Sequence, residues 1–152
     1  GDTYFANMFA AYDALDAATK ERIEGLQAIH DAAHNSAGLL RNGFDEVSDV
    51  RETPGACHPL VRTQPKTGAE CLFLGRRPRS YIVGLDVAES DEFLDALWTH
   101  ATQERFTWCQ QWRTGDVVMW DNLAVLHRRD GFDGSYRRVM HRAQIKGTEA
   151  IA

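Results

Sequence analysis

The stretch WRTGDVVMWDNLAVLHRRDGFDGSYRRVMHRAQIKG, residues 112–147, holds the richest concentration of aromatic, acidic, histidine and arginine side chains in this chain. In its last part, residues 136–146, strand-like alternation places Arg138, Met140 and Arg142 on one face. Two guanidinium groups on one face, roughly 6.5–7 Å apart along a strand, repel each other unless an anion lies between them. Because arginine suits planar, bidentate carboxylate recognition, this face predicts an anion-binding site.

Two simpler interpretations of the same stretch remain open from the residues alone. The arginines could pair with surface carboxylates such as Asp130 and Asp133. His127, taken by itself, is typical of a structural histidine in a core or on a surface. Only the context around these residues can decide between a site and ordinary packing.

Patterning along the chain predicts helices first and strands later. Strands are expected at residues 58–63, 71–74, 106–112, 116–120, 124–127 and 136–146. Helices are expected at residues 7–15, 17–30 and 91–101, the second capped by Asp16 and the third by Ser90. Helices followed by strands that continue to the C-terminus predict one α+β domain with a β-sandwich or jelly-roll core.

Residues 34–55 are polar, contain glycine and show little periodicity, so they predict a long mobile loop of the kind that forms lids. The composition is that of an ordinary globular domain of 152 residues. A net charge of −5 argues against a general nucleic-acid or membrane-surface binder. The cysteines at positions 57, 71 and 109 lack metal or redox spacing and are expected to be reduced, buried thiols of a cytoplasmic protein.

Several ordered blocks of this chain resemble one known enzyme family. The blocks are G-D-V-V-M-W-D-N…H, R-R-V-M-H-R…G, HPLVRTQPKTG, ES-x-x-F-L-x-x-L and GDTYFANMFAAYDAL. Together they cover nearly the whole chain in the order found in the C-terminal half of the taurine/2,4-dichlorophenoxyacetate dioxygenase family. The loop at residues 34–55 is the part that matches least.

The resemblance implies a double-stranded β-helix, a cupin-like jelly roll with flanking helices, that is incomplete at the N-terminus. Residues 1–152 would be the C-terminal portion of a single catalytic domain. That domain would use Fe(II), with 2-oxoglutarate as co-substrate and O₂, to hydroxylate a small anionic substrate such as a carboxylate or sulfonate, releasing succinate and CO₂. The family binds iron through two histidines and one carboxylate, which leaves positions open for co-substrate and O₂. We also expect a cytoplasmic homo-oligomer.

Carried over residue by residue, the resemblance assigns four positions. His127 matches an iron-ligating histidine, and Arg138 matches the residue that binds the distal carboxylate of 2-oxoglutarate. Thr3 matches a hydroxyl donor to that carboxylate, and Arg142 matches a second anion-binding arginine. Trp120, Asp121 and Asn122 are interpreted as mainly structural, and His141 as packing. His30, Asp31 and His34 cluster, but the resemblance does not assign them to iron.

One departure from the family pattern limits these expectations. The family supplies its other two ligands from an H-x-D/E motif, and none of the 6 histidines here has Asp or Glu two residues later. In the family this motif lies before the GDT block, so it would precede Gly1. The alternative function is therefore a catalytically incompetent fragment or degenerate homologue, an anion- or partner-binding β-domain. A zinc enzyme is a weaker alternative, because no zinc-ligand spacing is present.

Overall fold

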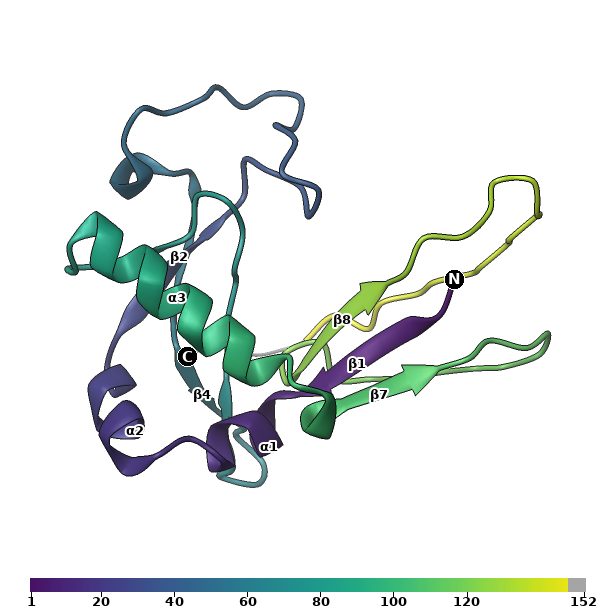
Figure 1. Ribbon diagram of the computed structural model, residues 1–152, viewed down its shortest axis with the longest axis horizontal. Coiled ribbons are helices and arrows are strands. Elements are labelled where there is room, and N and C mark those ends of the chain that lie inside the picture. Colours follow the sequence, from purple (N-terminus) through teal and green to yellow (C-terminus); the bar gives the residue numbers. More distant parts are fainter. Residues whose placement is uncertain (148–152) are drawn as a thin grey trace.

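The computed structural model describes residues 1–147, which form an α+β arrangement of antiparallel sheets and helices (Figure 1). One sheet has the strand order β7-β1-β8, with β1 at Thr3–Asn7, β7 at Thr107–Gln110 and β8 at Val125–Arg129. Its central strand therefore comes from the start of the chain and its flanking strands from the end. Strands predicted at residues 106–112 and 124–127 are confirmed as β7 and β8, with shifted ends.

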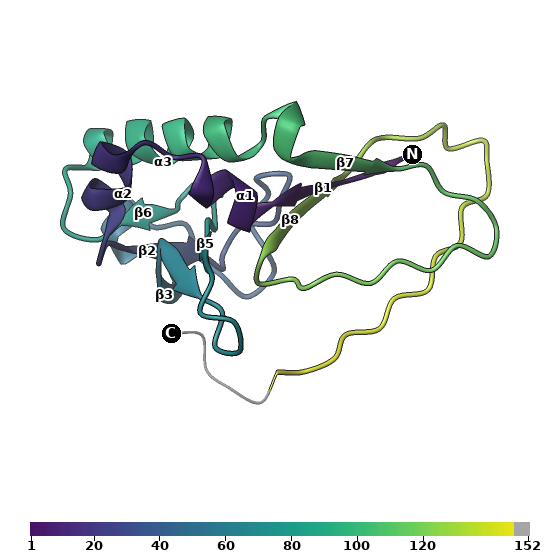
Figure 2. The same cartoon turned by 90° about the horizontal axis from the view of Figure 1, so that it is seen from below.

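A second sheet has the order β3-β2-β6 and carries a helix on one side. Its strands are β2 (Gln27–Asp31), β3 (Gly55–Pro59) and β6 (Tyr81–Ile82). A separate hairpin pairs β4 (Val61–Thr63) with β5 (Glu70–Leu72). Figure 2 shows the long helix α3, Val87–Ala101, running over β2 and β6.

The helix predicted at residues 17–30 is correct only in its first half. Helix α2 spans Ala17–Ile23, and Asp16 is confirmed as its N-cap because its Oδ1 accepts from the Thr19 amide at 2.8 Å. Gly25 then takes a φ of 72°, a left-handed conformation that ends helices readily. The residues that follow form β2, which is paired on both edges, so tertiary pairing overrides the local helical pattern.

Helix α3 begins earlier than its sequence pattern predicts. Asp86 is its N-cap and accepts from the Ala88 amide at 2.9 Å, so the expected Ser90 cap is wrong. Ser90 lies inside the helix, is buried, and its Oγ accepts from the Ile82 amide at 2.8 Å. This hydrogen bond fixes α3 to the edge of the second sheet.

The hydrophobic core lies where α3 and the short helix α1, Met8–Asp13, meet the strands. Fully buried apolar side chains lie in α1, α2, β5, β6 and α3, and at the link between β3 and β4: Met8, Ile23, Leu60, Leu72, Ile82, Leu94 and Leu97. A cluster of this kind provides the main stabilisation of a small domain. Short 3₁₀ turns at Val50–Glu52 and Glu104–Phe106 complete the described elements.

The strands predicted at residues 116–120 and 136–146 are not found in the part of the chain that the structure describes. Both segments run as extended loops beyond the first sheet (Figure 2), and side chains along them are exposed, including Val117 at 92% and Ile145 at 92%. His141 is exposed, so the packing role expected for it is wrong. Alternation alone forms no strand, because a strand also requires a partner edge for its backbone hydrogen bonds.

Residues 32–49 contain only an isolated bridge between His34 and Leu40, which agrees with the predicted loop. The cysteines are free thiols as expected, but only Cys71 is buried, whereas Cys57 is exposed. Within residues 1–147, no helix has both the length and the apolar character needed to cross a membrane.

Candidate active site

His127 lies on β8, where its imidazole is close to the aromatic rings of Phe5 and Trp120. It is paired across the sheet with Phe5, and the ring centroids lie 6.3 Å apart. Trp120 packs 5.2 Å from the same imidazole, and its Nε1 donates to Asn122 Oδ1 at 3.3 Å. Burial against these rings, together with the positive charge of Arg142, lowers the pKa of His127 below its ordinary value. The imidazole is therefore neutral at pH 7, with a lone pair available to a metal.

Thr3 lies on the same face of the sheet as His127. Thr3 is paired with Arg129 and Phe5 with His127, and residues opposite each other in an antiparallel pair share a face. Sheet geometry separates such diagonal neighbours by about 7–8 Å. Thr3 is buried, with 9% exposure, and its Oγ1 accepts from Trp112 Nε1 at 2.8 Å. The strand register thus brings together two of the four predicted site residues.

The two predicted arginines, Arg138 and Arg142, lie after β8 in a segment that forms no strand. Arg142 is exposed in the loop after β8, close enough to His127 to affect its pKa. Arg138 is half-buried, with its guanidinium carbon 5.8 Å from the centre of the Phe132 ring. Neither forms an ion pair within the described chain, whereas the neighbouring Arg128 pairs with Asp130. Surface pairing therefore explains Arg128 but not the two arginines assigned to the site.

The donor set at His127 is incomplete as an iron site. Residues 1–147 contain no group of three His, Cys, Asp or Glu side chains arranged to hold a metal ion. His127 fits as one ligand by its chemistry and exposure, and a chelating site needs further donors.

His127 lines two cavities on the first sheet. The larger, of about 690 Å³, lies along Tyr4, Leu126 and Arg128 beside the end of α3. The smaller, of about 510 Å³, joins His127 and Asn122 to Arg77 and His30 on the far side. This second cavity links the predicted iron ligand to the end of β2 and to the start of the loop at residues 32–49.

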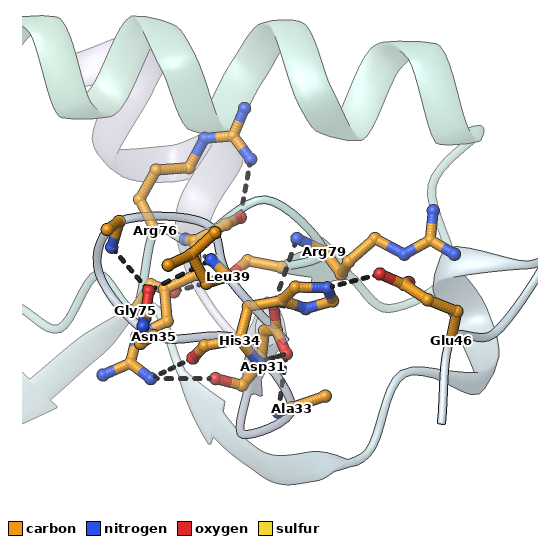
Figure 3. A network of polar contacts seen from close by, with 12 residues as sticks. Asp31, Ala33, His34, Asn35, Leu39, Glu46, Gly75, Arg76 and Arg79 are labelled. Atoms are coloured by element: carbon orange, nitrogen blue, oxygen red, sulfur yellow. Dashed lines mark hydrogen bonds and ion pairs between the residues drawn. The ribbon is translucent and has the colours of Figure 1, made fainter. Parts of the chain in front are cut away.

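The His30–Asp31–His34 cluster belongs to the anchor of that loop. Asp31 is enclosed and accepts from His34 Nδ1 at 2.9 Å, while His34 Nε2 reaches Glu46 at 3.2 Å (Figure 3). His30 packs on His58 and Phe73, and burial, His58 and Arg77 lower the pKa of His30 to about 4. Figure 3 shows His34 between the two carboxylates, so Asp31, His34 and Glu46 hold this loop together.

Comparison with known proteins gives the family of this chain. Residues 1–144 match the model of the taurine catabolism dioxygenase TauD, TfdA family. The chain belongs to the TauD/TfdA family. Family members that are α-ketoglutarate-dependent dioxygenases use Fe(II), 2-oxoglutarate and O₂.

Curated members of the TauD/TfdA family are similar along most of the chain. The α-ketoglutarate-dependent 2,4-dichlorophenoxyacetate dioxygenase of Cupriavidus pinatubonensis is 43% identical over 94% of this chain and 49% of its own length. The (S)-phenoxypropionate/α-ketoglutarate-dioxygenase of Delftia acidovorans is 38% identical over 97% of this chain and 51% of its own. The chain thus spans about half the length of the curated relatives it matches.

A solved structure of the TauD/TfdA family covers the whole chain. AAD-2, in complex with Mn(II) and N-oxalylglycine, superposes with a TM-score of 0.85 at 37% identity, over 100% of this chain and 60% of its own. Sequence patterns did not identify two features of the site, the Trp112 donor to Thr3 and the place of Arg77 in the cavity. Their contacts join segments far apart in the sequence, so no local pattern indicates them.

Proposed function

We propose that this chain forms the C-terminal part of an Fe(II)- and 2-oxoglutarate-dependent dioxygenase that hydroxylates a small organic anion, releasing succinate and CO₂. Family membership over residues 1–144 carries this proposal. The common sheet face of Thr3 and His127 supports it, since both residues are assigned to the site by resemblance. Relatives named for phenoxyacetate and phenoxypropionate support an aryloxy acid as substrate.

Each assigned residue has one task in this proposal. His127 binds the iron through its neutral imidazole. Thr3 donates its hydroxyl proton, and Arg138 two N–H groups, to the distal carboxylate of 2-oxoglutarate. Arg142 adds positive charge beside His127, where anionic groups gather. When bound, iron with 2-oxoglutarate and O₂ supplies the oxidising chemistry, while the protein supplies orientation and electrostatics.

The proposal places the second histidine and the carboxylate ligand in residues outside this chain. The strands described here would be part of a double-stranded β-helix that those residues complete. Exposed apolar side chains on the two long loops, Val117 and Met119 among them, support burial against such a complement. Within the same proposal, residues 34–55 form a mobile lid, and the enzyme is a cytoplasmic homo-oligomer.

The test uses the full-length protein. Succinate release that requires Fe(II), 2-oxoglutarate and O₂ is the expected result, and phenoxyacetate should stimulate it. His127→Ala should abolish this release and also weaken Mn(II)-dependent binding of N-oxalylglycine. His141→Ala, which removes an exposed imidazole from the neighbouring loop, serves as the matched control and should change neither. Full succinate release by His127→Ala would contradict the assignment.

The rival function, a β-domain that binds an anion without iron, makes a different prediction. Such a domain would bind N-oxalylglycine equally with and without Mn(II). The proposed enzyme would bind it more tightly with the metal, because the ligand then chelates the ion held by His127.

A further inference from the structure

The turn between β5 and β6 carries three arginines in four residues, Arg76-Arg77-Pro78-Arg79. Arg76 is neutralised by α3, since its Nη2 lies 2.6 Å from Asp91 and 2.7 Å from Asp95. Figure 3 shows Arg76 and Arg79 at the loop anchor beside Asp31 and His34. The three arginines therefore differ in their partners.

Arg77 is held by uncharged groups. Its Nη1 donates to the carbonyl oxygen of His34 at 2.9 Å and to that of Asp31 at 3.3 Å. No carboxylate lies within ion-pair distance of it in the described chain. Carbonyl oxygens orient a guanidinium without cancelling its charge, and Arg has five N–H donors in a fixed fork.

The carboxylate of Asp31, whose backbone oxygen accepts from Arg77, is engaged by other donors. Asp31 has 0% side-chain exposure, and its oxygens accept from the amides of Ala33, His34 and Arg79 as well as from His34 Nδ1. Its negative charge is therefore compensated within the loop anchor. Arg77 is left as a half-buried cation without a matching anion among residues 1–147.

The charge of Arg77 reaches the cavity of about 510 Å³ that His127 also lines. The remaining wall there includes Phe73, Leu123 and the imidazole of His30. Arg76 and Arg128 also line this cavity, but Arg76 pairs with Asp91 and Asp95, and Arg128 pairs with Asp130. Because the pKa of His30 is lowered to about 4, its imidazole is neutral at pH 7. Arg77 is therefore the lining cation without a carboxylate partner among the described residues. An aromatic and aliphatic wall with one cation left unpaired fits an apolar body with one acidic group.

We propose that Arg77 is the specificity-determining residue that binds the acidic group of the organic substrate within the cavity shared with His127. This inference rests on the proposed function. The guanidinium, fixed by the carbonyl oxygens of Asp31 and His34, would hold the substrate carboxylate at one end, so that the apolar body extends toward His127. The chemistry that it recognises is an aryl or alkyl chain ending in one carboxylate.

The experiment compares an acid with its neutral isostere. Binding of phenoxyacetate and of phenoxyacetamide to the full-length protein is measured by calorimetry, with and without 0.5 M KCl. We expect the acid to bind at least tenfold more tightly, and salt to weaken only the acid. Arg77→Gln should weaken acid binding at least tenfold and leave amide binding unchanged, while Arg77→Lys should restore part of the preference. The matched control is Arg41→Gln, an exposed arginine of the neighbouring loop.

Two results would overturn the role of Arg77. One is equal affinity of the unmodified protein for acid and amide, which needs no variant. The other is an equal loss of affinity for phenoxyacetate and for phenoxyacetamide in both Arg77→Gln and Arg77→Lys. A purely structural contact of Arg77 with the backbone carbonyls would give that result. Succinate release with Fe(II), 2-oxoglutarate and phenoxyacetate is measured in parallel on the unmodified protein and on Arg41→Gln. Its absence from both would contradict the proposed dioxygenase, whereas the affinities for acid and amide would still decide the role of Arg77.

Discussion

Trp112 Nε1 donates a 2.8 Å hydrogen bond to Oγ1 of Thr3, a residue 109 positions earlier in the chain. A hydroxyl that accepts from an indole must direct its own proton to another acceptor. Thr3 is buried on the face of His127, so its proton is oriented before any ligand arrives. In the proposed enzyme, this acceptor is the distal carboxylate of 2-oxoglutarate.

Trp112→Phe is expected to keep the fold and to weaken the binding of 2-oxoglutarate. Loss of one neutral hydrogen bond costs about 1 kcal/mol, which corresponds to about a fivefold weaker affinity. Calorimetric titration of N-oxalylglycine with Mn(II) measures the change. Trp108→Phe is the control, since Trp108 stacks on Phe5 and the structure gives its indole nitrogen no partner within the described residues. Equal affinity in both variants would remove Trp112 from this role.

Arg138→Ala is expected to have a larger effect on the same ligand. Removal of a charge-assisted contact should weaken 2-oxoglutarate binding by about 1.5–3 kcal/mol, or about 10- to 150-fold. The measurement is the 2-oxoglutarate concentration that gives half-maximal succinate release. The adjacent, exposed Arg137 provides the matched control, and Arg137→Ala should leave this concentration near its original value. An unchanged requirement in Arg138→Ala would exclude Arg138 as the carboxylate ligand.

The loop anchor is expected to weaken as pH rises. Both ring nitrogens of His34 meet carboxylates, so both must donate and the ring is protonated. The hydrogen bonds to Glu46 and Asp31 raise the pKa of His34 above its ordinary value of about 6.5. Stabilisation from a raised pKa is complete below the unfolded value and is lost as pH passes upward through the folded value. Amide protection factors of residues 35–49 should therefore fall above about pH 6.5.

Charges around His34 give the control for that experiment. The Asp31 and Glu46 carboxylates face its ring, Arg77 reaches its carbonyl oxygen, and the Arg79 amide reaches Asp31. Glu46→Gln removes the main cause of the raised pKa and should move the loss of protection to lower pH. Glu52→Gln, at an exposed position in the 3₁₀ turn, should leave the pH at which protection is lost unchanged. Superimposable profiles for Glu46→Gln and the unmodified protein would contradict the anchor.

Gly55→Ala is expected to destabilise the second sheet. A Cβ at this position would overlap the backbone oxygen of His30 in the paired strand β2, and backbone cannot move aside as a side chain can. The cost should be about 1–3 kcal/mol in the free energy of unfolding, measured by urea denaturation. Gly131→Ala introduces a Cβ that meets nothing within 4 Å and should cost much less. Equal urea midpoints for Gly55→Ala and Gly131→Ala would contradict the close backbone contact between β2 and β3 at Gly55.

Local signals predicted the parts of the fold that depend on neighbouring residues. Asp16 caps α2 as expected, and β8 lies where the pattern around His127 placed a strand. The helix predicted through residue 30 and the strand predicted at residues 136–146 failed because their outcome depends on pairing partners. β2 has two such partners, and residues 136–146 have none in the described chain. Periodicity describes a residue's own segment and does not report which edge is available to it.

The candidate site likewise contains residues that the sequence indicated and one that it did not. Resemblance indicated Thr3 and His127, and the strand register places both on one face. It gave no sign of Arg77, whose partners are the backbone carbonyls of Asp31 and His34, more than forty residues away in sequence. Carbonyl oxygens are common to every residue, so no side-chain pattern can mark such a contact. Roles for Arg138 and Arg142 stay predictions until the measurements above are made.

Strand pairing and loop anchoring differ in how much sequence change they tolerate during evolution. Thr3 and His127 owe their shared face to the register of β1 and β8, and one inserted residue in either strand would reverse the side chains beyond it. Residues 32–49 depend on contacts near their ends, so they tolerate insertion and exchange. Sequence changes in this loop can therefore accumulate while the register that places Thr3 and His127 on one face is kept.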